Sequence, residues 1–188
     1  MDAAFDEYWM RQALREAEKA AEAGEVPLGC VIVEPPEDPS APPAAARLLA
    51  RAHNQTETLT DSTAHAEMLA LSAAFATRGN WRLTGARLYV TKEPCPMCAG
   101  AIALSRVDAV VWGVSDPKRG GGTVFGIFEH KGMNHHPEIV SGVLEESCRG
   151  VLVDFFRRRR AESKAADSPS QADEEDGLMG NGGWPCES

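Results

Sequence analysis

No stretch of the 188-residue sequence is apolar over the roughly 20 residues that a membrane-spanning helix needs. The N-terminal segment also lacks the apolar core of a secretory signal, and it carries Asp2, Asp6 and Glu7. It does not have the Arg-rich character of a transit peptide either. We therefore expect no membrane association and a cytoplasmic protein.

Cysteines are few, and their number, five, is odd. An odd count in a chain without an export signal argues against a disulfide framework. Two of them form the pair Cys95-x-x-Cys98, which in such a chain indicates metal binding or redox chemistry. A phosphate-binding loop is also missing, because no Gly-Lys-Ser/Thr follows the three glycines at 120–122.

Bases are outnumbered by acids, 19 to 28, which gives a net charge of −9. Much of the excess lies in residues 161–188, which contain seven acids and one lysine. This segment is predicted to be an acidic disordered tail that follows a folded domain at 1–160. Because the imbalance is concentrated in the tail, net charge neither supports nor excludes a nucleic-acid ligand.

Helix-type and strand-type segments alternate along the domain. Helices are predicted at 5–23, 63–76, 95–104 and 144–160, and strands at 29–33, 48–52, 86–91 and 107–114. The Pro-rich segment 34–46 precludes a helix or a central strand, so it is predicted to be a loop joining the first two strands as a hairpin. The later strand–helix–strand order predicts parallel crossovers, and hence a three-layer α/β domain with a mixed sheet.

Two short motifs carry the chemistry, Thr63-Ala-His65-Ala-Glu67 and Pro94-Cys95-Pro-Met-Cys98. One imidazole and two thiolates form a ligand set that suits zinc. In mid-helix His65 and Glu67 would point to opposite sides, so both can serve one centre only near a helix N-terminus. The cysteine pair is also predicted at a helix start, where the positive helix end favours thiolates.

The number of ligands separates a catalytic from a structural zinc site. Three protein ligands leave one position for water, whereas a closed structural site needs four. Cys30 and His53 are the only plausible fourth ligands upstream, and each is isolated. With a zinc-bound water as nucleophile, Glu67 is predicted to shuttle its proton to a ring nitrogen and then to departing ammonia. A redox pair is the alternative, and it predicts that zinc is absent.

The combination of His-x-Glu with Pro-Cys-x-x-Cys is the signature of cytidine-deaminase-like zinc deaminases, of which tRNA adenosine deaminases are a known case. Over about residues 5–160 the chain resembles the bacterial-type tRNA adenosine deaminases. The matching stretches are Glu7-Tyr-Trp-Met-Arg-Gln-Ala-Leu14, Glu25-Val-Pro-Leu-Gly-Cys30, Arg51-Ala-His-Asn54, 64–68, 88–101, Met133-Asn-His135, 138–148 and Phe155-Phe-Arg157.

This resemblance implies a three-layer α/β/α domain with a mixed, roughly five-stranded sheet and one zinc ion per subunit. It also implies a homodimer that converts adenosine to inosine at the wobble position of a tRNA anticodon stem-loop. Asn54 matches a residue that contacts the target base. The other implied substrate-binding residues are Val26, Pro27, Leu28, Ala66, Asp116, Lys118, Asn134, His135, Phe156 and Arg157.

Some features depart from the family pattern or leave alternatives open. Segment 34–46 replaces what is usually a tight turn and is interpreted as a surface insertion, and the loop at 118–124 is about one residue shorter than usual. The arginines at 157–160 either balance the negative end of the last helix or contact phosphates. A free guanine or cytosine deaminase and a non-catalytic zinc subunit that presents RNA are the competing functions. Glu67 argues against the latter, which needs no proton shuttle.

Overall fold

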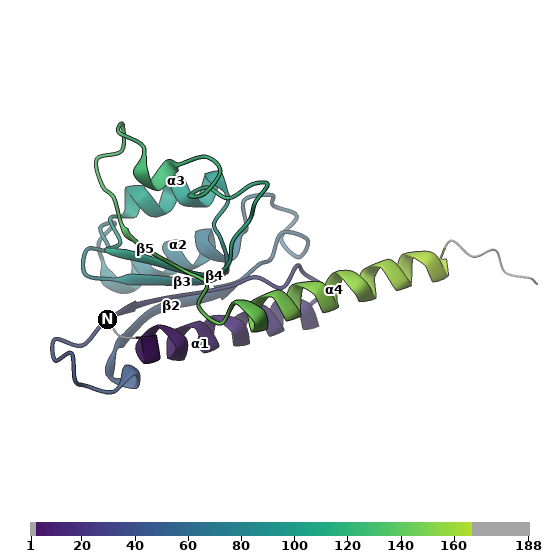
Figure 1. Cartoon of the computed structure of the whole chain (residues 1–188), viewed down its shortest axis with the longest axis horizontal. Helices are drawn as coiled ribbons and strands as arrows, with labels where there is room; N and C mark the ends of the chain where they lie inside the picture. Colours follow the sequence, from purple (N-terminus) through teal and green to yellow (C-terminus); the bar gives the residue numbers. More distant parts are fainter. Residues whose placement is uncertain (1–2, 167–188) are drawn as a thin grey trace, which may run out of the picture. The chain divides into compact units, whose positions relative to one another are not determined.

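The computed structural model describes residues 3–166 (Figure 1). In chain order the elements are α1 (Ala3–Glu22), β1 (Gly29–Glu34), the 3-10 helix η1 (Pro43–Ala45), β2 (Arg47–His53), α2 (Ala66–Arg78), β3 (Arg87–Lys92), α3 (Pro96–Ser105), β4 (Ala109–Val114), the 3-10 helix η2 (Ile127–Glu129), β5 (Glu138–Ser141) and α4 (Glu145–Ala166). Residues up to Phe155 form one compact unit, and the remainder of α4 belongs to a second.

The strands form one mixed sheet in the order β2-β1-β3-β4-β5. Strand β1 pairs antiparallel with β2 and with β3, whereas β3, β4 and β5 run parallel. Both the predicted hairpin and the predicted parallel crossover are confirmed, and with them the mixed sheet. The chain leaves the carboxyl end of β3 directly into Pro94 and Cys95, so the topology places the cysteine motif at that edge of the sheet.

Alternation along the strands divides the core into two layers. Val31, Val33 and Tyr89 face one side, where they pack with Trp9 of α1 and with Cys148 at the start of α4. The residues between them in sequence face the other side and pack with α2 and α3. These are Cys30, Ile32, Leu88 and Val90. Helices therefore cover both faces of the sheet, as Figure 1 shows for α1 below it and α2 and α3 above it.

The structure differs from the sequence predictions mainly at the start of α2, at β5 and at the end of α4. Helix α2 begins at Ala66 with His65 as its N-cap, so the predicted start at Thr63, with Ser62 or Thr63 as cap, is wrong. The Thr63 hydroxyl instead donates to Asp61, 2.7 Å away. Strand β5 has no counterpart among the strands predicted from the sequence, because it is short and mostly exposed.

The last helix runs past Arg160 to Ala166, so the start of the predicted tail is helical. Residues 161–166 read Ala-Glu-Ser-Lys-Ala-Ala, and most of these side chains favour a helix. The remainder of the predicted tail, 167–188, lies outside the described residues. Among the helices of 3–166, none is apolar over a length that would cross a membrane.

The segment at 34–46 is not wholly irregular, since it contains η1. Its last residue, Ala46, is buried in the core layer between α1 and the sheet.

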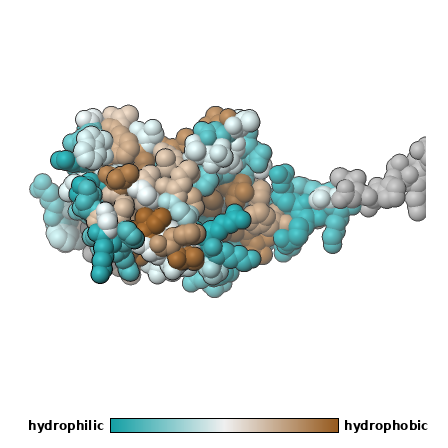
Figure 2. Space-filling model, turned by 90° about the horizontal axis from the view of Figure 1, so that it is seen from above, coloured by the Kyte–Doolittle hydropathy of each residue, from teal (hydrophilic) through white to brown (hydrophobic). Residues whose placement is uncertain are grey.

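The face of the molecule seen from above, on the side away from α1, carries apolar patches between polar ones (Figure 2). Leu104, on α3, is 62% exposed.

Candidate metal centre

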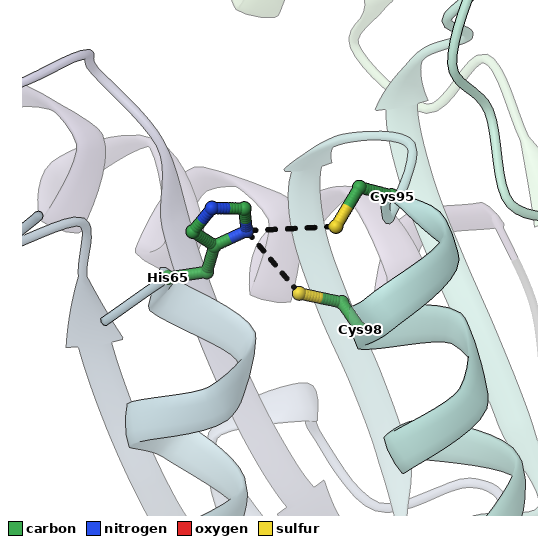
Figure 3. Close-up of side chains that lie close together, drawn as sticks. All are labelled: His65, Cys95 and Cys98. Carbon is green, nitrogen blue, oxygen red and sulfur yellow. Dashed lines mark hydrogen bonds between the residues drawn. The ribbon is translucent and has the colours of Figure 1, made fainter. Parts of the chain in front are cut away.

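Two helix starts on the same side of the sheet bring the three predicted ligands together. His65 is the N-cap of α2 and Cys95 the N-cap of α3, and both have extended backbone. Pro96 occupies the first turn of α3, where its missing N–H leaves no hydrogen bond unmade. The His65 imidazole is not used to cap its own helix, and its Nδ1 atom faces both the Cys95 and the Cys98 sulfur (Figure 3).

The geometry fits one tetrahedral ion. His65 Nδ1 lies 3.4 Å from Cys98 Sγ and 3.6 Å from Cys95 Sγ, and the three ligand atoms lie within 4.8 Å of one another. Zinc bonds of about 2.3 Å to sulfur and about 2.1 Å to nitrogen place these atoms about 3.6 Å apart in a tetrahedron. The side chains are therefore already spaced as ligands of one zinc ion.

The electrostatics of the centre favour a thiolate. A hydrogen bond from Cys98, together with His65, lowers the pKa of Cys95 to about 4 although burial acts against it. Its hydrogen bond to Cys95 and its burial raise the pKa of Cys98. The ends of α2 and α3 add positive potential at the same point.

Glu67, in the first turn of α2, is the acid of the centre. Its side chain is almost fully buried, and its Oε2 has no hydrogen-bond partner among the described residues. Burial raises the pKa of Glu67, while its hydrogen bond to Cys98 and the nearby His65 oppose the rise. An unpartnered buried carboxylate oxygen beside three metal ligands is a group that can hold and pass on a proton.

The two candidates for a fourth ligand do not belong to the cluster of described ligand atoms. Cys30 is fully buried in the sheet, and its burial and the nearby Glu67 raise its thiol pKa well above the ordinary value. His53 Nδ1 lies 3.6 Å from Glu16 Oε2 of α1. Within residues 3–166, the metal-ligand cluster comprises His65, Cys95 and Cys98 alone. Three ligands are one fewer than a closed structural zinc site needs.

Asn54 directly follows β2 and is buried. The backbone N–H of its neighbour Gln55 donates to Ala64, next to His65, at 3.0 Å. The backbone N–H of Asn54 itself donates to Leu28 at 3.0 Å. Of the predicted pocket residues, Pro27 and Ala66 are buried, whereas Val26 and Leu28 are half-buried. Backbone hydrogen bonds thus connect the predicted loop 26–28 to Asn54, and the residue after Asn54 to the segment that leads into His65.

Glu93 is a residue that the sequence reasoning missed. Its buried carboxylate accepts hydrogen bonds from the backbone N–H groups of Asp116, Gly122 and Thr123 at 2.8, 3.2 and 2.7 Å. The N–H of Gly121 also donates to Pro94, at 2.8 Å. Hydrogen bonds to Glu93 and Pro94 thus connect the loop after β4 to the cysteine motif. The only sequence signal was an acid directly before Pro94-Cys95.

The residues predicted to meet flanking nucleotides differ in how far their polar groups already bond within the protein. Asp116 pairs with Lys92 and also accepts the backbone N–H groups of Lys118 and Arg119. His135 Nε2 lies 2.6 Å from the carbonyl of Val107, and the carbonyl of Asn134 accepts a bond from Arg106.

The Asp116 carboxylate and the His135 Nε2 atom are thus engaged within the protein. The Lys118 side chain is exposed. Phe156 and Arg157 belong to the second unit, so their part in the site stays a prediction.

Comparison with known proteins gives concordant matches. The family model of the cytidine and deoxycytidylate deaminase zinc-binding region matches residues 3–114. A tRNA-specific adenosine deaminase of Bacillus subtilis is 52% identical over 86% of this chain and 94% of that protein. One from Haemophilus influenzae is 44% identical over 87% of this chain and 93% of its own length.

Solved structures share the fold. A structure from studies of A-to-I editing by tRNA deaminases at the wobble position of transfer RNA has a TM-score of 0.69 and 38% identity. That match covers 77% of this chain and 99% of the other. A guanine deaminase of Nitrosomonas europaea reaches a TM-score of 0.66 at 22% identity, covering 80% and 84% of the two chains, which shows a common fold alone.

Proposed function

We infer that this chain converts adenosine to inosine in tRNA. It belongs to the cytidine and deoxycytidylate deaminase zinc-binding family, and within that family to the tRNA-specific adenosine deaminases. We place the reaction at the wobble position of the anticodon. The single observation that supports this most is the His65, Cys95 and Cys98 cluster with the unpartnered Glu67 oxygen beside it. A tRNA substrate also agrees with the cytoplasmic location expected from the sequence.

His65, Cys95 and Cys98 would hold the zinc ion. Zinc, when bound there, supplies the Lewis acidity that makes water nucleophilic near neutral pH. Glu67 takes the proton that the attacking water loses and delivers it to the ring nitrogen next to the reacting carbon. Glu67 then takes the remaining proton of the added hydroxyl and passes it to the amino group. The C–N bond breaks, ammonia leaves and a carbonyl remains. Burial serves this role, because a carboxylate with a raised pKa also acts as an acid.

Substrate recognition is proposed to follow the geometry around the centre. Asn54, Ala66 and the loop of Val26, Pro27 and Leu28 would surround the flipped-out base. Lys118, Asn134, Phe156 and Arg157 would meet the flanking nucleotides, through basic contacts and stacking typical of loop RNA. For Asp116 and His135 we propose an indirect part, because the Asp116 carboxylate and the His135 Nε2 already bond within the protein.

We further propose a homodimer. Leu104 is strongly exposed on α3, and the residues that precede it at helical spacing, Met97 and Ala101, are only partly buried against the core. An apolar stripe on a helix that also carries the metal ligands is suited to a second copy of the chain. Light scattering after size exclusion should give twice the chain mass for the wild type, and Leu104→Glu should lower it. A wild-type monomer at micromolar concentration would contradict the dimer.

The function is tested with a tRNA anticodon stem-loop that carries adenosine at the wobble position. Inosine and ammonia are measured, with Glu67→Ala as the blank and free adenine, guanine, cytosine and cytidine in parallel. We expect inosine at the wobble position and no turnover of the free compounds. Turnover of guanine or cytosine with the RNA untouched would instead establish a nucleobase deaminase.

A further inference from the structure

Lys92 is the last residue of β3, at the end of the strand from which the chain enters the cysteine motif. Leu88 and Val90, four and two residues earlier, pack with α2 and α3. Because alternate residues of a strand share a face, Lys92 points to the same side of the sheet as these two residues. The ligand Cys95 follows three residues later. Lys92 therefore brings a positive charge to the metal side of the sheet.

Lys92 is close enough to the metal centre to act on it electrostatically. A hydrogen bond to Cys95 raises the pKa of His65, and the charge of Lys92 acts to lower it. Lys92 is not itself a metal ligand, because an ammonium group has only N–H donors and no acceptor atom to offer an ion. Its charge is therefore available to the substrate rather than to the metal.

Asp116, in the loop after β4, holds the Lys92 ammonium group in place. The two side chains form an ion pair. The Asp116 carboxylate also accepts the backbone N–H groups of Lys118 and Arg119 at 2.9 and 3.0 Å, so the carboxylate is itself fixed. An ammonium group has three N–H donors, and within residues 3–166 this carboxylate is the one acceptor that Lys92 meets. N–H groups of Lys92 are thus left for a further acceptor.

The side of this ion pair that faces solvent is positive. The Lys92 side chain is 33% exposed, against 12% for that of Asp116. Glu93, the next residue along the chain, is buried, and its carboxylate accepts three backbone N–H groups of the loop. Lys118 and Arg119, by contrast, are exposed. A group that approaches from solvent therefore meets cations here, and the group of RNA that matches them is phosphate.

We propose that Lys92 binds a backbone phosphate of the substrate RNA beside the target nucleotide, through the N–H groups that Asp116 leaves unused. The inference rests on the proposed function, because it takes an RNA strand to pass the metal centre. It adds a phosphate contact from the end of β3 to those proposed for the loop after β4. Such a contact positions the strand and does not depend on its base sequence.

Lys92→Met removes the ammonium group and keeps a flexible stem. Binding of a labelled wobble-adenosine stem-loop is measured by fluorescence anisotropy in the Glu67→Ala background, so that bound RNA is not turned over. We expect Kd to rise about tenfold, the loss of one charge-assisted hydrogen bond. Between about 50 and about 200 mM salt, the slope of log Kd against log salt concentration should fall by about 0.7, the share of one phosphate on a single strand. Lys92→Arg, which keeps the charge, should keep the slope.

A freed Asp116 carboxylate would repel the RNA and weaken binding for a different reason. Lys92→Met is therefore repeated in the Asp116→Asn variant, which has no carboxylate to free. We expect the slope to fall by about 0.7 there as well. An unchanged slope in that background would overturn the proposal, because the loss would then belong to the carboxylate.

Lys19→Met is the matched control. Lys19 is also paired with a buried acid, Glu16, at 2.7 Å, but it belongs to α1, on the other face of the sheet from α2 and α3 (Figure 1). Its replacement should leave Kd and the salt slope unchanged. Zinc content and thermal midpoint are compared for every variant. If Lys92→Met does not fold, Lys92→Gln, whose amide can still donate to Asp116, is expected to show the same change of slope.

The outcomes for the reaction and for the phosphate contact are separate. Absence of inosine from the stem-loop with the wild-type enzyme would refute the proposed function, and the anisotropy would still decide on Lys92. A folded, zinc-loaded Lys92→Met or Lys92→Gln variant with the Kd and slope of its parent would refute the phosphate contact, whether or not the wild type forms inosine.

Discussion

Glu93 and Thr123, thirty residues apart in sequence, are joined by a 2.7 Å hydrogen bond from the Thr123 backbone N–H to the buried Glu93 carboxylate, and the Thr123 hydroxyl donates to the same group at 3.0 Å. Glu93 directly precedes Pro94 and the ligand Cys95. The loop after β4 and the metal-binding motif therefore hold each other in place. This loop also contains Asp116 and Lys118, for which a part in tRNA binding is proposed.

Glu93→Ala should consequently loosen the loop and destabilise the domain. Backbone N–H groups of Asp116, Gly122 and Thr123 lose their acceptor, and the loss in unfolding free energy is expected to be about 2–4 kcal/mol. Urea unfolding measures it, with Glu129→Ala on the exposed side of η2 as the matched control. A loss no larger than that of the control would show that the loop is held by other contacts.

Glu67→Ala should keep zinc and abolish turnover. The three ligands are untouched, so zinc content measured by mass spectrometry should stay near one ion per chain. Inosine formation should fall at least about 100-fold, since general acid–base catalysis typically contributes that factor or more. Near wild-type turnover would remove Glu67 from the proposed mechanism.

Cys95→Ser and Cys98→Ser should each release the metal. A hydroxyl is a harder and less acidic ligand than a thiolate, so it binds zinc more weakly. Cys148→Ala is the control, because this thiol is buried between α1 and the sheet, in the core layer on the other face of the sheet from the metal ligands. Zinc retained at one ion per chain in both serine variants, or lost in the Cys148 variant, would contradict the assignment. Zinc absent from the wild type, with Cys95 and Cys98 cycling as a disulfide, would favour the redox alternative.

Asp116 is predicted to stabilise the fold in a pH-dependent way. Burial acts to raise its pKa, but Lys92 and the backbone N–H groups of Lys118 and Arg119 lower the pKa of Asp116 to about 2. In the unfolded chain it titrates near about 3.9. A carboxyl whose pKa is depressed on folding contributes its full stabilisation above the unfolded value, and this is lost as the pH falls towards the folded value.

Asp116→Asn is therefore expected to lower the free energy of unfolding at pH 7 by about 1 kcal/mol, because Lys92 is partly exposed to solvent. The difference from wild type should shrink below about pH 4 and vanish near about pH 2. Urea unfolding across this range measures it. An equal difference at both ends of the range would show that charge is not the cause.

The sequence alone determined the chemistry of the metal centre, because that chemistry depends on local spacing. His65 with Glu67, and Cys95 with Cys98, each need only a helix start to converge, and the sequence predicted helix starts there. The order of the elements likewise predicted both connections, because two successive strands joined by a loop indicate a hairpin and a strand–helix–strand order indicates a parallel crossover. The prediction placed the start of α2 at the wrong residue and did not include β5. Helix caps and short exposed strands carry weak signals in the local sequence.

Only the tertiary structure decided how the centre is supported. Lys92 and Asp116 are 24 residues apart and Glu93 and Thr123 are 30, and no periodicity links such pairs. The positions of the two candidate fourth ligands also depend on the fold, which places His53 beside Glu16 and encloses Cys30 in the sheet. The pairing of buried donors with buried acceptors depends on how the helices, strands and loops pack against one another. That packing involves residues far apart in the sequence, so local patterns do not reveal it.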